Sequence, residues 1–287
     1  MTEEQPGVGP TIQRMLLGAR LRRLRTDAGL TREQAGAAIR ASEWKIHRLE
    51  NGQVGYKERD IVDLLRLYGV TDPNEIDLFI TLAQEANQPG WWNTYSDLLP
   101  QWFRAYIDLE SAATLIRTYE GQLVPGLLQT EDYMRALMQG AFHEPPEDTE
   151  RRIALRRTRQ RLLTRPDGPR LWAVVDEAAL QRAVGSRDVM RAQLARLREA
   201  TELPSVVLQV LPLAVGAHPA MTTAFSILRF PDEALPDVVY LEHLTDAAYL
   251  DRRESVDHYY HVMELISARS AAPEETPEIL DKILEEW

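Results

Sequence analysis

Two short helices joined by a tight turn are encoded in Leu30–Gly52, and this segment constrains the fold more than any other part of the chain. Thr31 and Ser42 each precede a run of helix-forming residues, and a hydroxyl group at such a position can cap the first turn. Apolar residues recur at helical spacing in both runs, at Ala35, Ala38, Ile39, Ile46 and Leu49. Gly36 suits a close crossing of the two helices, and Gly52 suits the end of the second. The pattern predicts a helix-turn-helix, whose second helix enters the major groove of DNA.

Charge is divided unevenly along the chain. The 287 residues carry a net charge of −11, yet Thr11–Asp60 contains 11 Lys and Arg against 6 Asp and Glu. A basic segment attached to an acidic body suits a DNA-binding head whose other domain is repelled by phosphate. A solvated helix face could give the same local excess, so this alternative stays open on charge alone.

Length and composition indicate the number of domains and the cellular compartment. A chain of 287 residues is expected to form one or two domains. It contains no cysteine, which excludes a disulfide framework and a thiolate metal site and is typical of a reducing cytoplasm. No apolar run has the form of a signal peptide or the length of a membrane span, so we expect a cytoplasmic protein with no membrane partner.

The N-terminal part is predicted to be an all-α domain of five helices over residues 12–87, after a flexible tail over residues 1–11. One helix is expected at 12–28, before the helix-turn-helix, and another at 56–68. Asp72 and Pro73 then begin a fifth, since proline is tolerated in the first helical turn. A linker is expected over residues 88–101.

The body, residues 102–287, mixes helical and strand patterns. Strands are expected at 171–175, 206–211, 223–230 and 238–241. Helices are expected at 110–120, 131–140, 148–164 and 252–271, with shorter ones begun by Asp176, Ser186 and Thr276. Together these elements predict an α+β domain around one small sheet, and hence an α+β protein overall.

The second helix of the helix-turn-helix carries most of the predicted DNA contacts. Base readers are expected near its start, at Glu43, Trp44 and Lys45. Phosphate contacts are expected at Arg32, Ser42, His47, Arg48 and Lys57, and Thr31 completes the predicted DNA-binding set. Trp44 could instead contact a second copy of the chain. Glu50 is predicted to be structural, paired with Arg20 or Arg23 of the first helix.

The residues of this segment also resemble a known family, the XRE (Cro/cI-like) DNA-binding domains. The resemblance spans about residues 15–86 and rests on Thr31, Arg32, Glu33, Gly36, Ser42, Ile46, Leu49, Glu50 and Gly52. Two positions depart from the family pattern. Arg40 stands where many relatives have a turn glycine, so the turn either differs or holds a strained arginine. Arg32 stands where glutamine is commoner.

Residues 90–270 resemble the C-terminal domain of actinobacterial XRE regulators described as antitoxin-like or WhiJ-like. The resemblance rests on Trp91-Trp92, the run from Val124 to Thr130, the run from Gly216 to Pro219, and the run from Val239 to Glu242. It implies a developmental or antibiotic-production regulator, often encoded beside a small acidic partner protein.

No catalytic, cofactor or metal site is predicted. His218 and His243 lie in loop-like segments, but no serine elbow, phosphate loop or zinc-protease motif accompanies them. His258 and His261 have a spacing that could hold a metal with Glu264, although paired or exposed histidines are commoner on helices. The arginine-rich helix at 148–164 could bind phosphate or DNA, but pairing with acidic groups of the body is favoured.

Two function classes follow from these features. The favoured one is a homodimeric, sequence-specific regulator that binds double-stranded DNA and whose body binds a protein partner or a small-molecule effector. The other is an antitoxin-like interaction protein that holds a small partner and uses DNA binding for autoregulation.

Overall fold

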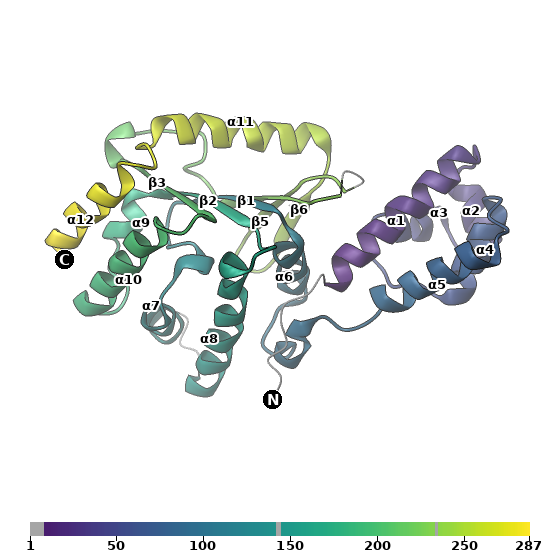
Figure 1. The fold of residues 1–287 in the computed structure, drawn as a ribbon, viewed down its shortest axis with the longest axis horizontal. Coiled ribbons are helices and arrows are strands. Elements are labelled where there is room, and N and C mark those ends of the chain that lie inside the picture. The colour runs from purple at the N-terminus through teal and green to yellow at the C-terminus, as the bar shows by residue number, and fades with distance from the viewer. Residues whose placement is uncertain (1–8, 142–144, 233–234) are drawn as a thin grey trace. The chain divides into compact units, whose positions relative to one another are not determined.

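A computed structural model describes residues 9–141, 145–232 and 235–287, which form two compact units (Figure 1). The first unit consists of the described residues up to Asn93, together with Ile107–Ala112 and the described residues Asp232 and Leu235. The second includes Thr94–Tyr106 and most of the remaining chain. Residues 1–8 of the predicted tail lie outside the described residues, and the first helix begins at Pro10, two residues before the expected start.

The first unit contains the predicted five-helix, all-α arrangement. Its helices are α1 (Pro10–Asp27), α2 (Arg32–Ala38), α3 (Glu43–Glu50), α4 (Glu58–Leu67) and α5 (Pro73–Ala86). The Asp72 carboxylate accepts a hydrogen bond from the backbone N–H of Asn74 and so caps α5 as expected. The core is apolar and draws on every one of these helices, with Leu17, Leu21, Ala35, Ile46, Leu49, Ile61, Leu65, Phe79 and Ala83 among its buried side chains. A short 3-10 helix, Trp91–Tyr95, lies within the segment expected to be a linker.

The second unit is built on one six-stranded mixed sheet. Its strands are β1 (Leu115–Glu120), β2 (Arg170–Asp176), β3 (Val206–Leu211), β4 (Phe225–Arg229), β5 (Val238–Glu242) and β6 (Ala247–Leu250). Their order across the sheet is β3-β2-β1-β4-β5-β6. The first three strands are mutually parallel, and β4, β5 and β6 continue the sheet in antiparallel pairs. The predicted α+β class is therefore confirmed.

Helices cover both faces of this sheet. They are α7 (Glu131–Ala136), α8 (Pro146–Gln160), α9 (Glu177–Gln181), α10 (Arg187–Ala200), α11 (Arg253–Arg269) and α12 (Thr276–Glu286), while α6 (Gln101–Ala112) precedes β1. Helix α11 runs across one face, and α7, α8 and α10 lie on the other side (Figure 1). Beneath α11 is an apolar cluster that includes Val174, Phe225, Ile227, Val239 and Met263.

The helix predicted at 110–120 is wrong. Helix α6 ends at Ala112, and Leu115–Glu120 is the strand β1. The strand lies between β2 and β4 and forms backbone hydrogen bonds on both sides, which outweighs the local helical preference of its residues. Strand β6 was not predicted, because its four residues, Ala247–Leu250, show no alternation of apolar and polar side chains.

The arginines of α8 pair with acidic groups, as favoured from the sequence. Arg151 forms an ion pair with Asp97 at 2.7 Å, and Arg157 forms one with Glu131 at 3.2 Å. In addition, Glu150 of the same helix accepts from Arg135 at 2.8 Å. The first two contacts offset the charge of two arginines of α8, Arg151 and Arg157, within the second unit.

The carboxyl group of Glu120, at the end of β1, makes the stability of the protein depend on pH. Burial and the nearby Glu242 carboxylate raise the pKa of Glu120 from its ordinary value to about 8, with Arg156 opposing them. A raised pKa favours the protonated form in the folded state, so the stabilisation from this group is complete at acidic pH and is lost as the pH rises through 8.

We therefore expect Glu120→Gln to raise the free energy of unfolding by about 1–3 kcal/mol at pH 8. The lower part of this range applies if the carboxyl group keeps some contact with solvent in the folded state. The difference from the unmodified chain should close below about pH 4, where the reference carboxyl is largely protonated in both states. Urea denaturation at several pH values measures it. Glu147→Gln, at an exposed position of α8, is the matched control, and equal pH profiles for the two variants would contradict the assignment.

Candidate nucleic-acid interface

Helices α2 and α3 form the predicted helix-turn-helix, and side-chain caps set both helix starts. The Thr31 hydroxyl accepts from the Gln34 backbone N–H, and the Gln34 side chain accepts in return from the Thr31 N–H, which completes a capping box. The Ser42 hydroxyl accepts from the Lys45 backbone N–H at 3.4 Å. Thr31 and Ser42, both predicted DNA contacts, therefore also act as the caps that the sequence indicates.

Gly36 allows the two helices to meet closely. A Cβ atom on Gly36 would lie 2.7 Å from the backbone oxygen of Ala41 and 3.1 Å from the carbonyl carbon of Ser42. No side chain fits at that distance, so the glycine fixes how near the turn passes to α2.

The turn itself holds a strained arginine. Arg40 has a φ of 55°, in the left-handed region, and it is the sole non-glycine residue with a positive φ among those described. The side chain is exposed. Of the two outcomes expected at this departure from the family pattern, the structure has the strained arginine rather than a different turn.

Arg40→Gly is expected to stabilise the first unit by about 0.5–1 kcal/mol. Relief of the left-handed conformation gains about 1–2 kcal/mol, and the greater freedom of glycine in the unfolded chain returns about 0.4–1 kcal/mol of it. The midpoint of urea denaturation measures the change. Arg40→Ala removes the same charge but keeps the Cβ atom, so it should give no such gain, and equal stabilisation by both variants would rule out backbone strain as the cause.

The outer face of α3 presents most of the predicted DNA-binding side chains to solvent. Glu43, Trp44 and Arg48 are exposed, and Trp44 is 68% exposed. The Trp44 ring meets His47 edge to face, with 5.7 Å between ring centroids. An exposed tryptophan beside charged groups is poised to contact another molecule, since so large an apolar surface is costly to leave in water.

The inner face of α3 is held by a buried ion-pair network around Glu50. The Glu50 carboxylate accepts from Arg25 at 2.5 Å and from Arg32 at 3.1 Å. Glu50 is structural, as predicted, but the predicted partners Arg20 and Arg23 are wrong. Arg25 lies one helical turn after the buried Leu21 and so projects into the core.

Lys45 is held by a second ion pair. Its ammonium group lies 2.5 Å from Asp60, a buried residue in the first turn of α4, and Arg59 contacts the same carboxylate at 3.4 Å. Of the three predicted base readers, Lys45 thus has a partner inside the unit, whereas Glu43 and Trp44 face solvent. Sequence reasoning missed Asp60, because an acidic residue in the first turn of a helix is expected there for helix stability alone.

The remaining predicted contacts lie at the edge of this surface. Lys57 is exposed just before α4, and the Arg32 side chain is partly exposed while it contacts Glu50. His47 is half-buried and contacts the Asn51 side chain at 3.1 Å. Contacts to phosphate from this rim would set the register of α3 on a duplex.

Two protein families match the chain. Residues 16–79 match a family described as a helix-turn-helix domain, and residues 103–282 match a domain of unknown function, DUF5753. The second match spans well over half of the sequence. The chain belongs to the DUF5753 family. No curated protein and no solved structure matches the chain.

Histidines elsewhere in this DUF5753 protein do not gather into a metal site within the described ranges. His218 lies 3.5 Å from Asp176 and 3.4 Å from the Tyr119 hydroxyl group. His243 contacts Asp246 at 2.8 Å in the turn after β5. No helix in the described part of the chain is long and apolar enough to cross a membrane.

Proposed function

We propose that this protein is a homodimeric, sequence-specific transcriptional regulator that reads DNA with α3 and binds an effector or a protein partner with its second unit. The observation that carries the proposal is the division of α3 into two faces. Glu43, Trp44 and Arg48 are exposed on one face, while Glu50 anchors the other through its ion pairs. A helix fixed from behind with polar and aromatic groups in front suits readout in the major groove.

The match to a helix-turn-helix family and the resemblance to XRE domains support the same proposal. Regulators of this kind act on chromosomal DNA, so the proposed location is the cytoplasm. The lack of cysteine fits that reducing compartment.

The proposed dimer follows from the small reach of a single recognition helix. Two copies related by a two-fold axis can bind half-sites about one helical turn apart and so read a longer sequence. Analytical ultracentrifugation of the full chain at micromolar concentration tests this, and a monomer there would contradict it.

Arg48→Ala tests the assigned DNA surface. We expect about three- to tenfold weaker binding to the DNA upstream of the protein's own gene, because one phosphate contact is lost, and a salt dependence whose slope is smaller by about 1. Fluorescence anisotropy over a range of salt concentrations measures both. The matched control is Arg253→Ala in the second unit, where the arginine is exposed, and equal effects of the two variants would mean that the surface is misassigned.

The interaction-protein alternative is favoured by exposed apolar side chains in the second unit. Leu244 is fully exposed between β5 and β6, and Leu213 and Met221 are also exposed. An exposed apolar side chain can contact a protein partner, and several such side chains on one surface would form a binding patch. A gel shift with and without a candidate partner protein tests this alternative: a change in the affinity for DNA would support it, and an unchanged affinity would count against it.

A further inference from the structure

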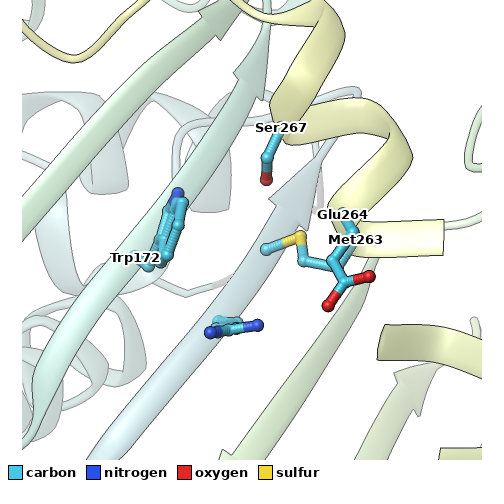
Figure 2. Close-up of a pocket in the computed structure, with 5 residues that line it drawn as sticks. Trp172, Met263, Glu264 and Ser267 are labelled. Atoms are coloured by element: carbon cyan, nitrogen blue, oxygen red, sulfur yellow. The ribbon is translucent and has the colours of Figure 1, made fainter. Parts of the chain in front are cut away.

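A cavity of about 260 Å³ lies between the sheet and α11 in the second unit (Figure 2). Its floor comes from Arg117 on β1 and Trp172 on β2, which face each other in the parallel register of the two strands. Helix α11 supplies Met263, Glu264 and Ser267 around the same space (Figure 2). The volume is just below that of drug-sized ligand sites, which indicates a small ligand.

Among the described residues, Arg117 has aromatic neighbours but no ion-pair partner. Its guanidinium group lies 4.9 Å from the centre of the Trp172 ring and 5.3 Å from that of Tyr260. The Nε atom is buried and has no hydrogen-bond partner. Within the described part of the chain, no carboxylate lies within ion-pair distance of Arg117. A cation that is partly removed from water without a counter-charge is unfavourable, so the site is incomplete without an anion.

The nearby Arg229 does not share this deficit. It also stacks on Tyr260, at 5.4 Å, but Asp237 neutralises it at 3.2 Å. Among the described residues that line the cavity, Arg117 is therefore the one cation, and it can balance a single negative charge.

The aromatic wall of the cavity is held rigidly. The Trp172 ring nitrogen donates to the Gln209 side chain at 2.8 Å, and Gln209 in turn donates to the backbone oxygens of Ser267 and Ala271. The ring therefore keeps its orientation, with one flat face toward the guanidinium. A flat, apolar ligand body can stack in such a place, and Met263 can adjust to its shape.

Glu264 limits the charge that the ligand can carry. It lines the cavity as an exposed carboxylate with no ion pair among the described residues. A dianion such as a phosphate monoester would meet this like charge, whereas a monocarboxylate can bind Arg117 through two parallel hydrogen bonds and leave Glu264 to solvent.

We propose that this cavity binds a small monocarboxylate with a flat, apolar body, and that it is the effector site of the regulator. The second half of this statement rests on the proposed function, while the first stands on the cavity alone. Ligand binding and DNA binding must therefore be measured separately.

Isothermal titration calorimetry of the full chain with benzoate and phenylacetate tests the site, with benzamide as the uncharged counterpart. We expect both carboxylates to bind and benzamide to bind at least about tenfold more weakly, since it lacks the charge that Arg117 requires. Arg117→Met should weaken carboxylate binding by at least about tenfold. Arg253→Met makes the same substitution at an exposed arginine of α11, and it should leave the affinity for the carboxylates unchanged. No carboxylate binding at millimolar concentration, or equal binding by Arg117→Met, would overturn the site.

Thermal denaturation without ligand separates a binding role from a structural one. Arg117 contacts the rings of Trp172 and Tyr260 but has no ion pair among the described residues, and methionine can keep an apolar contact with both rings. Arg117→Met should therefore melt at the same temperature or higher, and a clear fall would assign Arg117 to stability and overturn the proposal. Ser267→Leu, which fills the cavity from α11, gives an independent variant that should lose carboxylate binding and keep the fold. Retained binding in Ser267→Leu would place the ligand elsewhere.

The proposal that the cavity is an effector site is tested by fluorescence anisotropy, which measures the affinity of the protein for the DNA upstream of its gene. A carboxylate that changes DNA affinity in the unmodified chain, but not in Arg117→Met, supports it. Carboxylate binding with unaltered DNA affinity overturns it and leaves the site in place. Carboxylate binding by a chain that binds no DNA would instead reject the proposed function.

Discussion

Glu50→Ala is expected to lower the free energy of unfolding of the first unit by about 3–5 kcal/mol, the cost of breaking a buried ion pair by removing one partner. Glu50 is 4% exposed and accepts from both Arg25 and Arg32. Without it, the hydrogen bond to the Leu30 backbone oxygen is the one that remains for the buried guanidinium of Arg25 among the described residues. Helix α3 thereby loses its electrostatic link to α1.

Amide hydrogen exchange is the suitable measurement, because it reports the first unit separately in the full chain. Exchange in α1 and α3 should accelerate by more than about a hundredfold. The control is Glu58→Ala, at an exposed position in the first turn of α4, where a change within about 0.5 kcal/mol is expected. A similar small change for Glu50→Ala would show that the network contributes little to stability.

Gly18→Leu is expected to destabilise the first unit by at least about 3 kcal/mol, the upper end of the cost of overpacking. A Cβ atom on Gly18 would lie 2.5 Å from the backbone oxygens of both Leu49 and Glu50. Backbone atoms cannot turn aside as a side chain can, so α1 and α3 would have to separate.

The same substitution should also weaken DNA binding, because α3 would move relative to the rest of its unit. Urea denaturation and anisotropy measure the two effects on one sample. Gly140→Leu is the control, since nothing lies within 4 Å of a Cβ atom at Gly140. If Gly18→Leu resembled this control, the close approach of the two helices would not be needed for either property.

Local chemistry made the helix-turn-helix predictable. The caps at Thr31 and Ser42 and the glycine at Gly36 act through neighbours a few residues away, so their effects can be inferred from the sequence alone. At Arg40 the sequence left two outcomes open, a different turn or a strained arginine, and the backbone geometry decides for the second. The strand β1 was not, because its conformation depends on partners at 170–175 and 225–229, far along the chain.

The candidate sites show the same limit. Exposure of Trp44 on α3 follows from helical spacing. The pairing of Lys45 with Asp60 depends on how α4 is placed against α3, which spacing within one helix does not reveal. The cavity at Arg117 could not be predicted from the sequence for a further reason. The sequence pattern predicts a helix over residues 110–120, and Trp172, which faces Arg117, lies on another strand.

The ion pair between Lys45 and Asp60 has a consequence for selectivity. If Lys45 reads a base as proposed, it gains from that contact only where the base attracts its ammonium group more strongly than Asp60 does. Guanine, with two acceptors on the edge of the major groove, is the strongest competitor. At every other base the lysine would stay where it is and add nothing to the attraction. The protein would then stay bound to non-specific DNA for a short time only, and it would find its specific site faster.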